Sequence, residues 1–169
     1  MGVEEHRAAA KTALGFAVLT VSDTRNRATD EGGALVAELA VAAGHRVVDR
    51  KIVLDEADAI RGAVASALAD RATDVVIATG GTGLSPRDVT VEAVRPLFER
   101  EIEGFGELFR VNSWSEVGPA AMLSRATAGL ARGKAIFLLP GSPKAVRLAM
   151  EKLILPEAGH LLAQARRAD

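Results

Sequence analysis

The sequence contains no cysteine, and only 4% of its residues are aromatic. The absence of cysteine excludes a disulfide framework, a thiolate metal site and a cysteine nucleophile. With so few aromatic side chains, the core has to be built from alanine, valine, leucine and isoleucine. This composition favours an α/β fold.

Long apolar runs and a strong charge imbalance are also lacking. No stretch approaches the roughly 20 apolar residues of a membrane-spanning helix, and residues 1–13 carry charges without the apolar region of a signal peptide. The formal net charge of −1 gives no electrostatic footprint for nucleic acid. We therefore expect a soluble cytoplasmic protein without membrane or nucleic-acid partners, with a tail at residues 1–13 and one domain at residues 14–165.

The most informative stretch is residues 74–98. Its first part, Asp74 to Thr79, has the apolar composition of a strand buried on both faces. A loop of Gly80, Gly81, Thr82 and Gly83 follows at once. Such a loop can adopt positive φ and turn several backbone N–H groups toward an anion. A tight strand-to-helix turn without a ligand is the alternative interpretation.

The glycine loop leads to Arg87 and Asp88, and then to a helix for which Thr90 is the expected N-cap. An earlier strand–helix unit has a strand at residues 15–21. Its helix begins at about residue 31, with Thr29 or Asp30 as the cap.

Another unit has a more polar strand at residues 46–54, which we place nearer the sheet edge, and a helix that Asp55 could cap. Right-handed crossovers between these units predict a parallel sheet covered on both faces. Ligands bind beyond the carboxyl ends of strands in such sheets. We therefore expect Ser22 and Asp23, Asp55, and the loop from Gly80 to Asp88 to converge on one cleft, although each alone also fits ordinary loop chemistry.

Residues 99–123 are irregular, and we expect short helices with a turn between them. Phe105, Phe109 and Trp114 lie in this region. We expect them to cluster and seal a core edge or a subunit contact, which is favoured over a base-stacking platform. Near the C-terminus, Pro156 is expected to interrupt the last helical stretch.

Two short runs at residues 126–131 and 134–139 flank Arg132 and Gly133 and predict a hairpin. The second run leads into Pro140, Gly141, Ser142 and Pro143. Ser142 as N-cap and Pro143 as first helical residue predict a helix start, which suits a phosphate or a ribose.

Five segments, in this order, resemble the MoaB/MogA family of molybdenum-cofactor biosynthesis proteins. They are TVSDTR at 20–25, GGTGLSPRDVT at 80–90, EGFGELFR at 103–110, LSR at 123–125 and LPGSP at 139–143. The resemblance covers about residues 14–165 and is closer to the MoaB branch. It implies a three-layer α/β/α sandwich and a homo-oligomer, either a trimer or a hexamer.

Active members of this family adenylylate molybdopterin with ATP and Mg²⁺ and release pyrophosphate. The resemblance implies that Asp55 and Asp88 are catalytic and hold the metal. It implies substrate and nucleotide binding for Thr20, Ser22, Asp23, Gly80, Gly81, Thr82, Gly83, Arg87, Ser124, Arg125, Pro140, Gly141 and Ser142. The intact motif at residues 87–90 implies a competent site.

The residues suit this chemistry. The phosphate of molybdopterin is largely ionised near pH 7 and needs no general base, and we expect the three histidines to lie away from the cleft. Two unit charges at 4 Å repel by about 4 kcal/mol at an effective dielectric of 20. Mg²⁺ on the two aspartates, with Arg87 or Arg125 on the phosphate oxygens, would offset this repulsion.

Two alternatives stay open from the sequence. One is a molybdopterin-binding or scaffold protein of the same pathway without turnover, and the other is a nucleotide-processing hydrolase, because a related domain occurs in CinA-type proteins. The sequence also leaves open whether molybdenum or tungsten is finally inserted, and whether other proteins of cofactor biosynthesis are partners.

Overall fold

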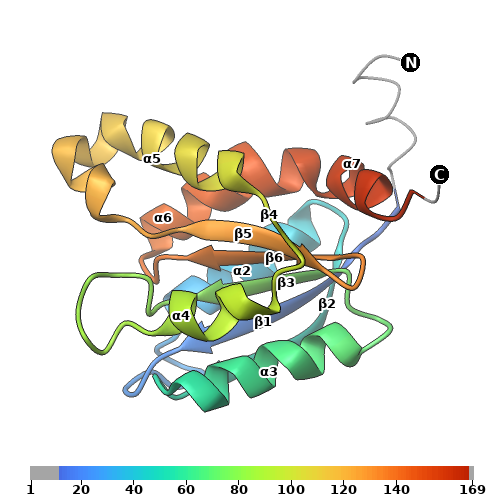
Figure 1. The fold of residues 1–169 in the computed structure, drawn as a ribbon, viewed down its shortest axis with the longest axis horizontal. Helices are drawn as coiled ribbons and strands as arrows, with labels where there is room; N and C mark the ends of the chain where they lie inside the picture. The colour runs from blue at the N-terminus through green and yellow to red at the C-terminus, as the bar shows by residue number, and fades with distance from the viewer. Residues whose placement is uncertain (1–11, 168–169) are drawn as a thin grey trace.

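A six-stranded sheet with the order β2-β1-β3-β6-β5-β4 runs through the centre of the protein (Figure 1). The computed structural model describes residues 12–167, so most of the tail predicted at residues 1–13 lies outside the described residues. The strands are β1 (Gly15–Val21), β2 (Arg46–Val53), β3 (Val75–Thr79), β4 (Arg100–Glu101), β5 (Thr127–Ala131) and β6 (Lys134–Leu139). β2, β1, β3 and β6 are parallel, whereas β5 and β4 are antiparallel additions. The parallel arrangement predicted for the three strand–helix units is therefore confirmed, and the sheet as a whole is mostly parallel.

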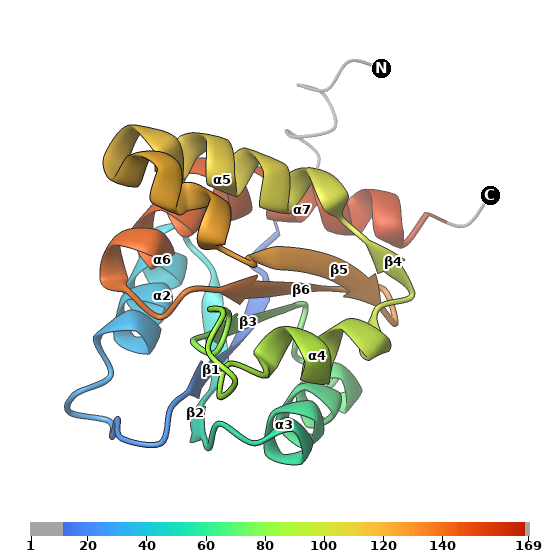
Figure 2. The same ribbon diagram turned by 60° about the vertical axis from the view of Figure 1, so that its left-hand side comes forward.

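Helices cover both faces of the sheet (Figure 2). One face carries α2 (Glu31–Ala42), α5 (Glu103–Val117), α6 (Pro143–Ala149) and α7 (Leu155–Ala165), and the other carries α3 (Ala57–Ala69) and α4 (Thr90–Val94). Alternate residues of β1 serve the two cores, because Phe16 and Val18 pack on the first face and Ala17 and Leu19 on the second. The result is a three-layer α/β/α sandwich. Within residues 12–167, no helix is long and apolar enough to cross a membrane.

The sheet edges follow the sequence pattern. β2 lies at one edge, as its mixed composition predicts, and its residues are exposed or only partly buried. The predicted hairpin joins β5 to β6 through Arg132 and Gly133, which have φ values of 52° and 69°. Two consecutive positive φ values are what a two-residue hairpin turn of the type I′ kind requires.

The prediction of short helices at residues 99–123 is wrong. After β4 the chain forms the single 15-residue helix α5, followed by the 3-10 helix η2 (Gly118–Leu123). Gly106 does not break this helix but lets it approach β5, since a Cβ there would lie 2.7 Å from the carbonyl oxygen of Ala126. The helix ends instead at Gly118, which has a φ of 59°.

Of the three aromatic residues expected to seal a core edge or a subunit contact, two are buried in the core. The rings of Phe105 and Phe109 lie 6.2 Å apart, and Phe137 meets Phe105 edge-on at 5.0 Å. Trp114, in contrast, is 60% exposed and is not part of the core. The predicted core edge is therefore confirmed for Phe105 and Phe109, whereas for Trp114 only the alternative, a subunit contact, stays a prediction.

Pro156 does not interrupt the last helical stretch. The chain passes from α6 through the π-helical segment η3 (Met150–Ile154) directly into α7. Pro156 stands in the first turn of α7, directly after this π-helical segment.

Two of the predicted helix caps are confirmed. The carboxylate of Asp30 accepts from the N–H of Gly33 at 2.9 Å, and the hydroxyl of Ser142 accepts from Ala145 at 3.2 Å. The other two caps are wrong. Glu56, not Asp55, is the N-cap residue of α3, and Thr90 is the first residue of α4, with its hydroxyl donating to the carbonyl of Gly80 at 2.9 Å. Asp55 is therefore not used to start a helix.

Candidate functional site

The loops that follow β1, β2 and β3 meet at the carboxyl edge of the sheet, as the sequence predicts. Asp23, after β1, accepts a hydrogen bond from the backbone N–H of Asp55, after β2, at 3.0 Å. The other carboxylate oxygen of Asp23 forms an ion pair with Arg87, from the loop after β3. One carboxylate thus joins all three loops.

Asp55 lies at the centre of this arrangement. Its Oδ1 atom is buried and has no hydrogen-bond partner among the described residues. Burial raises the pKa of Asp55, the negative charges of Asp23 and Asp88 raise it further, and the positive charge of Arg87 opposes them. A cation beside Asp55 would relieve both the missing contact and the repulsion.

Asp88 is held within its own loop. Its Oδ2 atom accepts from the backbone N–H of Ser85 at 3.0 Å. The backbone of Gly83 approaches so closely that a Cβ there would lie 2.6 Å from the same oxygen. Any side chain at position 83 would therefore collide with the carboxylate of Asp88.

The first half of the glycine loop is shaped around Asp55. Gly80 and Gly81 have φ values of 95° and 67°, which disfavour any other residue. A Cβ on Gly81 would lie 3.0 Å from Asp55 Oδ1 and 2.2 Å from the hydroxyl of Thr90. Thr82, for which the resemblance implies substrate or nucleotide binding, is only 3% exposed.

A cavity of about 330 Å³ lies next to this loop, between the ends of β1 and β3 and the starts of α2 and α6. Five residues from the sequence prediction line it: Thr20, Ser22, Gly80, Gly141 and Ser142. The hydroxyl of Thr20 is already committed, because it donates to the buried carboxylate of Asp30 at 2.9 Å. Ser22 accepts the backbone N–H of Arg25 at 3.0 Å, which shapes the loop after β1.

Thr79 also lines this cavity, and sequence reasoning missed it. The residue is 1% exposed, and its Oγ1 atom has no hydrogen-bond partner in the described part of the chain. A buried hydroxyl without a partner is unusual in a folded protein. Its position could have indicated this role, because Thr79 is the hydroxyl residue that ends an otherwise apolar strand.

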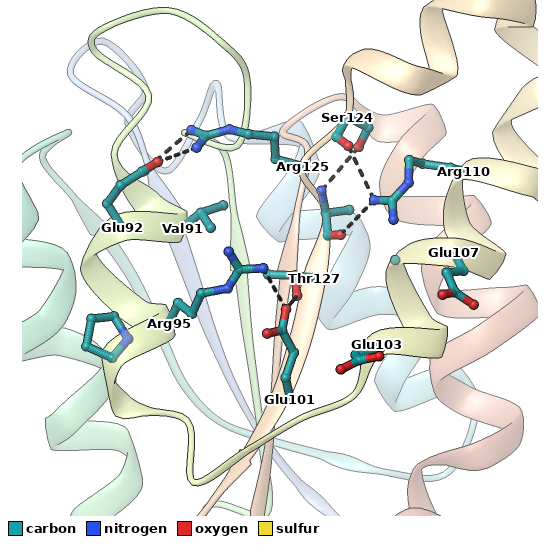
Figure 3. Close-up of a pocket in the computed structure, with 13 residues that line it drawn as sticks. Val91, Glu92, Arg95, Glu101, Glu103, Glu107, Arg110, Ser124, Arg125 and Thr127 are labelled. Atoms are coloured by element: carbon teal, nitrogen blue, oxygen red, sulfur yellow. Dashed lines mark hydrogen bonds and ion pairs between the residues drawn. The ribbon is translucent and has the colours of Figure 1, made fainter.

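Ser124 and Arg125 line a different cavity, of about 780 Å³, between α4 and α5 (Figure 3). Arg125 reaches back to the glycine loop, where its Nε donates to the carbonyl of Gly83 at 2.9 Å and its Nη2 to that of Asp88 at 3.0 Å. Ser124 turns its hydroxyl to the N–H of Ala126 at 3.3 Å. Of these two predicted residues, only Arg125 contacts the loop that carries Asp88.

The described histidines do not take part in the site, as expected. Nδ1 of His45 accepts the N–H of Leu14 at 3.2 Å, near the amino end of β1, and burial lowers the pKa of this imidazole. His160 lies in α7, and His6 is outside the described residues.

Within residues 12–167, no three His, Cys, Asp or Glu side chains are grouped so that they could hold a metal ion by themselves. A Mg²⁺ site does not need three, because this ion binds one or two carboxylates and completes its shell with phosphate oxygens and water. The unpartnered oxygen of Asp55 beside two further carboxylates fits such a donor set.

Comparisons with known proteins match proteins or domains connected with molybdopterin or the molybdenum cofactor. A family model described as a probable molybdopterin binding domain matches residues 17–160. Molybdenum cofactor biosynthesis protein B of Bacillus subtilis (strain 168) is 46% identical over 168 residues, which cover 99% of both sequences. Its namesake in Staphylococcus aureus (strain Mu50 / ATCC 700699) is 55% identical over 149 residues, or 86% of this chain and 88% of the relative. A crystal structure of a molybdenum cofactor biosynthesis protein B has a TM-score of 0.90 at 47% identity and covers 93% of this chain and 98% of its own.

Proposed function

Because the chain belongs to the molybdopterin-binding domain family, close to the MoaB proteins, we propose that it acts in molybdenum-cofactor biosynthesis. The proposed reaction is the transfer of AMP from ATP to the terminal phosphate of molybdopterin. An oxygen of that phosphate attacks the α-phosphorus of ATP, the bond from the α-phosphorus to the bridging oxygen breaks, and pyrophosphate leaves. No oxidant or further reactant is needed.

One observation carries this proposal above the others: Asp55 has a buried, unpartnered carboxylate oxygen beside the charges of Asp23 and Asp88. Such an arrangement is unfavourable unless a cation joins it. In the proposal, Asp55 and Asp88 hold Mg²⁺, which supplies positive charge to the phosphate groups of both substrates.

The glycine loop and the 330 Å³ cavity supply the rest of the site. The volume lies at the lower end of the range for small-molecule pockets, and its free hydroxyl at Thr79 is suited to a nucleotide. Arg87 is exposed and pairs with Asp23, so it can bind a phosphate oxygen without being buried. Because the attacking phosphate is ionised near pH 7, the absence of the described histidines from the site agrees with a reaction that needs no general base.

A homo-oligomer is part of the same proposal. Large apolar side chains are exposed along α5 and η2: Leu108, Val111, Trp114, Val117, Met122 and Leu123. Exposed apolar side chains gathered on two consecutive elements are typical of a surface that another protein covers. We propose that this set, named the α5 face, contacts a second copy of the chain.

The proposed reaction is tested by incubating the purified protein with molybdopterin, ATP and Mg²⁺ and measuring transfer of AMP. Asp88→Asn should abolish transfer, whereas Asp58→Asn, at a side chain that is 98% exposed on α3, should leave it unchanged. Failure of the wild type to transfer AMP would favour a binding protein without turnover. Transfer that survives Asp88→Asn would refute the assignment of the metal ligands.

A further inference from the structure

We infer that Arg125 is a positioning residue that fixes Asp88 for the cation from the far side of the loop. The inference rests on the proposed function and adds a residue whose action is indirect. The sequence alone suggested that Arg125 binds a phosphate oxygen. The structure assigns its guanidinium to protein groups instead.

Four hydrogen bonds hold this guanidinium. The first two go to the backbone, from Nε to the carbonyl of Gly83 and from Nη2 to the carbonyl of Asp88. The other two go to Glu92 on α4, one from Nη1 and one from Nη2 at 3.4 Å. Arginine has five donors in a rigid planar fork, so these contacts use most of its capacity.

The two backbone contacts lie at the two ends of the loop that presents Asp88. Residues 84–87, between them, are exposed. Within the loop, Ser85 and Asp88 are joined by hydrogen bonds of 2.8 Å and 3.0 Å, and the exposed Arg87 pairs with Asp23. Arg125, which lies two residues before β5, therefore holds both ends of the loop, and we call this arrangement the clamp. Without these two hydrogen bonds, the Asp88 carboxylate could move relative to Asp55.

The pair with Glu92 extends the clamp to α4. The hydrogen bond from Arg125 lowers the pKa of Glu92, so this carboxylate is ionised at neutral pH. Figure 3 shows Arg125 directed toward Glu92 at one end of the larger cavity. The side chain of Arg125 is 28% exposed and that of Glu92 is 57% exposed, so water partly screens this pair and the two backbone contacts carry more of the clamp.

A second ion pair in the same cavity provides a matched control. Arg95 pairs with Glu101 at 2.6 Å, and Glu101 also accepts the hydroxyl of Thr127 at 2.9 Å. Neither member of this pair makes a hydrogen bond to the loop between Gly83 and Asp88. Replacing Arg95 thus removes an arginine–glutamate pair from this wall of the cavity without touching the clamp.

The test measures binding of Mn²⁺, as a stand-in for Mg²⁺, by electron paramagnetic resonance in the presence of α,β-methylene-ATP. Arg125→Lys, which keeps the charge but loses the fork, should weaken Mn²⁺ affinity by about tenfold, the usual effect of removing a group that orients a metal ligand. Arg95→Lys should change it by less than about twofold. In an Asp88→Asn background, Arg125→Lys should cause no further loss, because the two changes act through one carboxylate.

Three results would overturn the inference: wild-type affinity in Arg125→Lys, an equal loss in Arg95→Lys, or an undiminished loss in the Asp88→Asn background, which would indicate direct contact with the ligand. Undetectable Mn²⁺ binding by the wild type would overturn it as well. The proposed reaction can be refuted independently of this inference. A wild type that binds Mn²⁺, shows the Arg125 effect and yet transfers no AMP would retain the inference and refute the transferase.

Discussion

Asp23 and Asp55 are joined by a hydrogen bond of 3.0 Å from the backbone N–H of Asp55 to the carboxylate of Asp23. Since Asp23 also pairs with Arg87, it sets the distance between the loops after β2 and β3 while its charge raises the pKa of Asp55. The fold thus positions a carboxylate at the cost of electrostatic strain. Strain of this kind is common at sites that bind ligands.

Replacing Asp55 with asparagine should therefore stabilise the ligand-free protein and reduce AMP transfer by at least about 100-fold. A carboxyl whose pKa is raised in the folded state weakens the fold at pH values above that pKa, and the effect disappears below the ordinary value of 3.8. The variant should show a higher free energy of unfolding than wild type in urea at pH 7, with a difference that shrinks toward pH 4. A variant that is less stable at pH 7 would contradict this reading of Asp55.

The same raised pKa predicts how cation binding depends on pH. Mg²⁺ binds the ionised carboxylate, so its affinity should fall as pH decreases through the raised pKa of Asp55, above the range of an ordinary aspartate. Calorimetric titrations of Mg²⁺ at several pH values between 4 and 7.5, with α,β-methylene-ATP bound, measure this. An Asp55→Asn protein that keeps both the affinity and its pH dependence would show that the cation binds elsewhere.

Much of this site could be predicted from the sequence, and the reasons for the misses are physical. β1 and β3 are recognisable because strands buried on both faces are continuous apolar runs, and their carboxyl ends locate Asp23 and Asp88. The length of α5 could not be predicted, because glycine usually weakens a helix, whereas Gly106 allows this helix to pack closely on the chain before β5.

Other features depend on contacts distant in sequence. Arg125 meets a carbonyl 42 positions away, and no local pattern reveals such a contact. Trp114 is apolar enough for a core, yet its place on the outer side of α5 leaves it exposed. Periodicity along a helix gives no information about whether another chain covers that side.

Gly83→Ala should reduce AMP transfer by about 10- to 100-fold, because the new Cβ would lie 2.6 Å from Asp88 Oδ2 and displace the carboxylate. Gly62→Ala is the matched control. It lies within α3 with no atom within 4 Å of the new Cβ, so it should raise stability by up to about 1 kcal/mol and leave activity unchanged. Kinetics and urea unfolding of both variants test this, and equal activities would show that the close approach of Gly83 is not needed for function.

Thr79→Val should weaken ATP binding by about tenfold without lowering the free energy of unfolding, because it removes a hydroxyl that has no partner in the described structure. Thr20→Val, in contrast, should lower the free energy of unfolding. It deprives the buried Asp30 of a hydrogen bond of 2.9 Å and should cost about 1–3 kcal/mol of stability. Calorimetry with ATP and urea unfolding separate the two effects. Unchanged ATP affinity in Thr79→Val would show that this hydroxyl does not bind ATP.

Trp114→Glu should convert the proposed oligomer to monomers, because it places a charge within the α5 face. Val41→Glu serves as the control, since Val41 is also exposed, at 59%, but lies on α2. Sedimentation equilibrium gives the mass of each variant. A wild-type protein that is already monomeric would remove the basis for assigning this surface to a second copy.

Release of pyrophosphate in the presence and absence of molybdopterin tests the central claim most directly. With Mg²⁺ and ATP, we predict release that starts only when molybdopterin is added, stops at one pyrophosphate per molybdopterin, and is lost in Asp88→Asn. Release that does not depend on molybdopterin, or no release when molybdopterin is bound, would contradict a transferase whose metal site is built from Asp55 and Asp88.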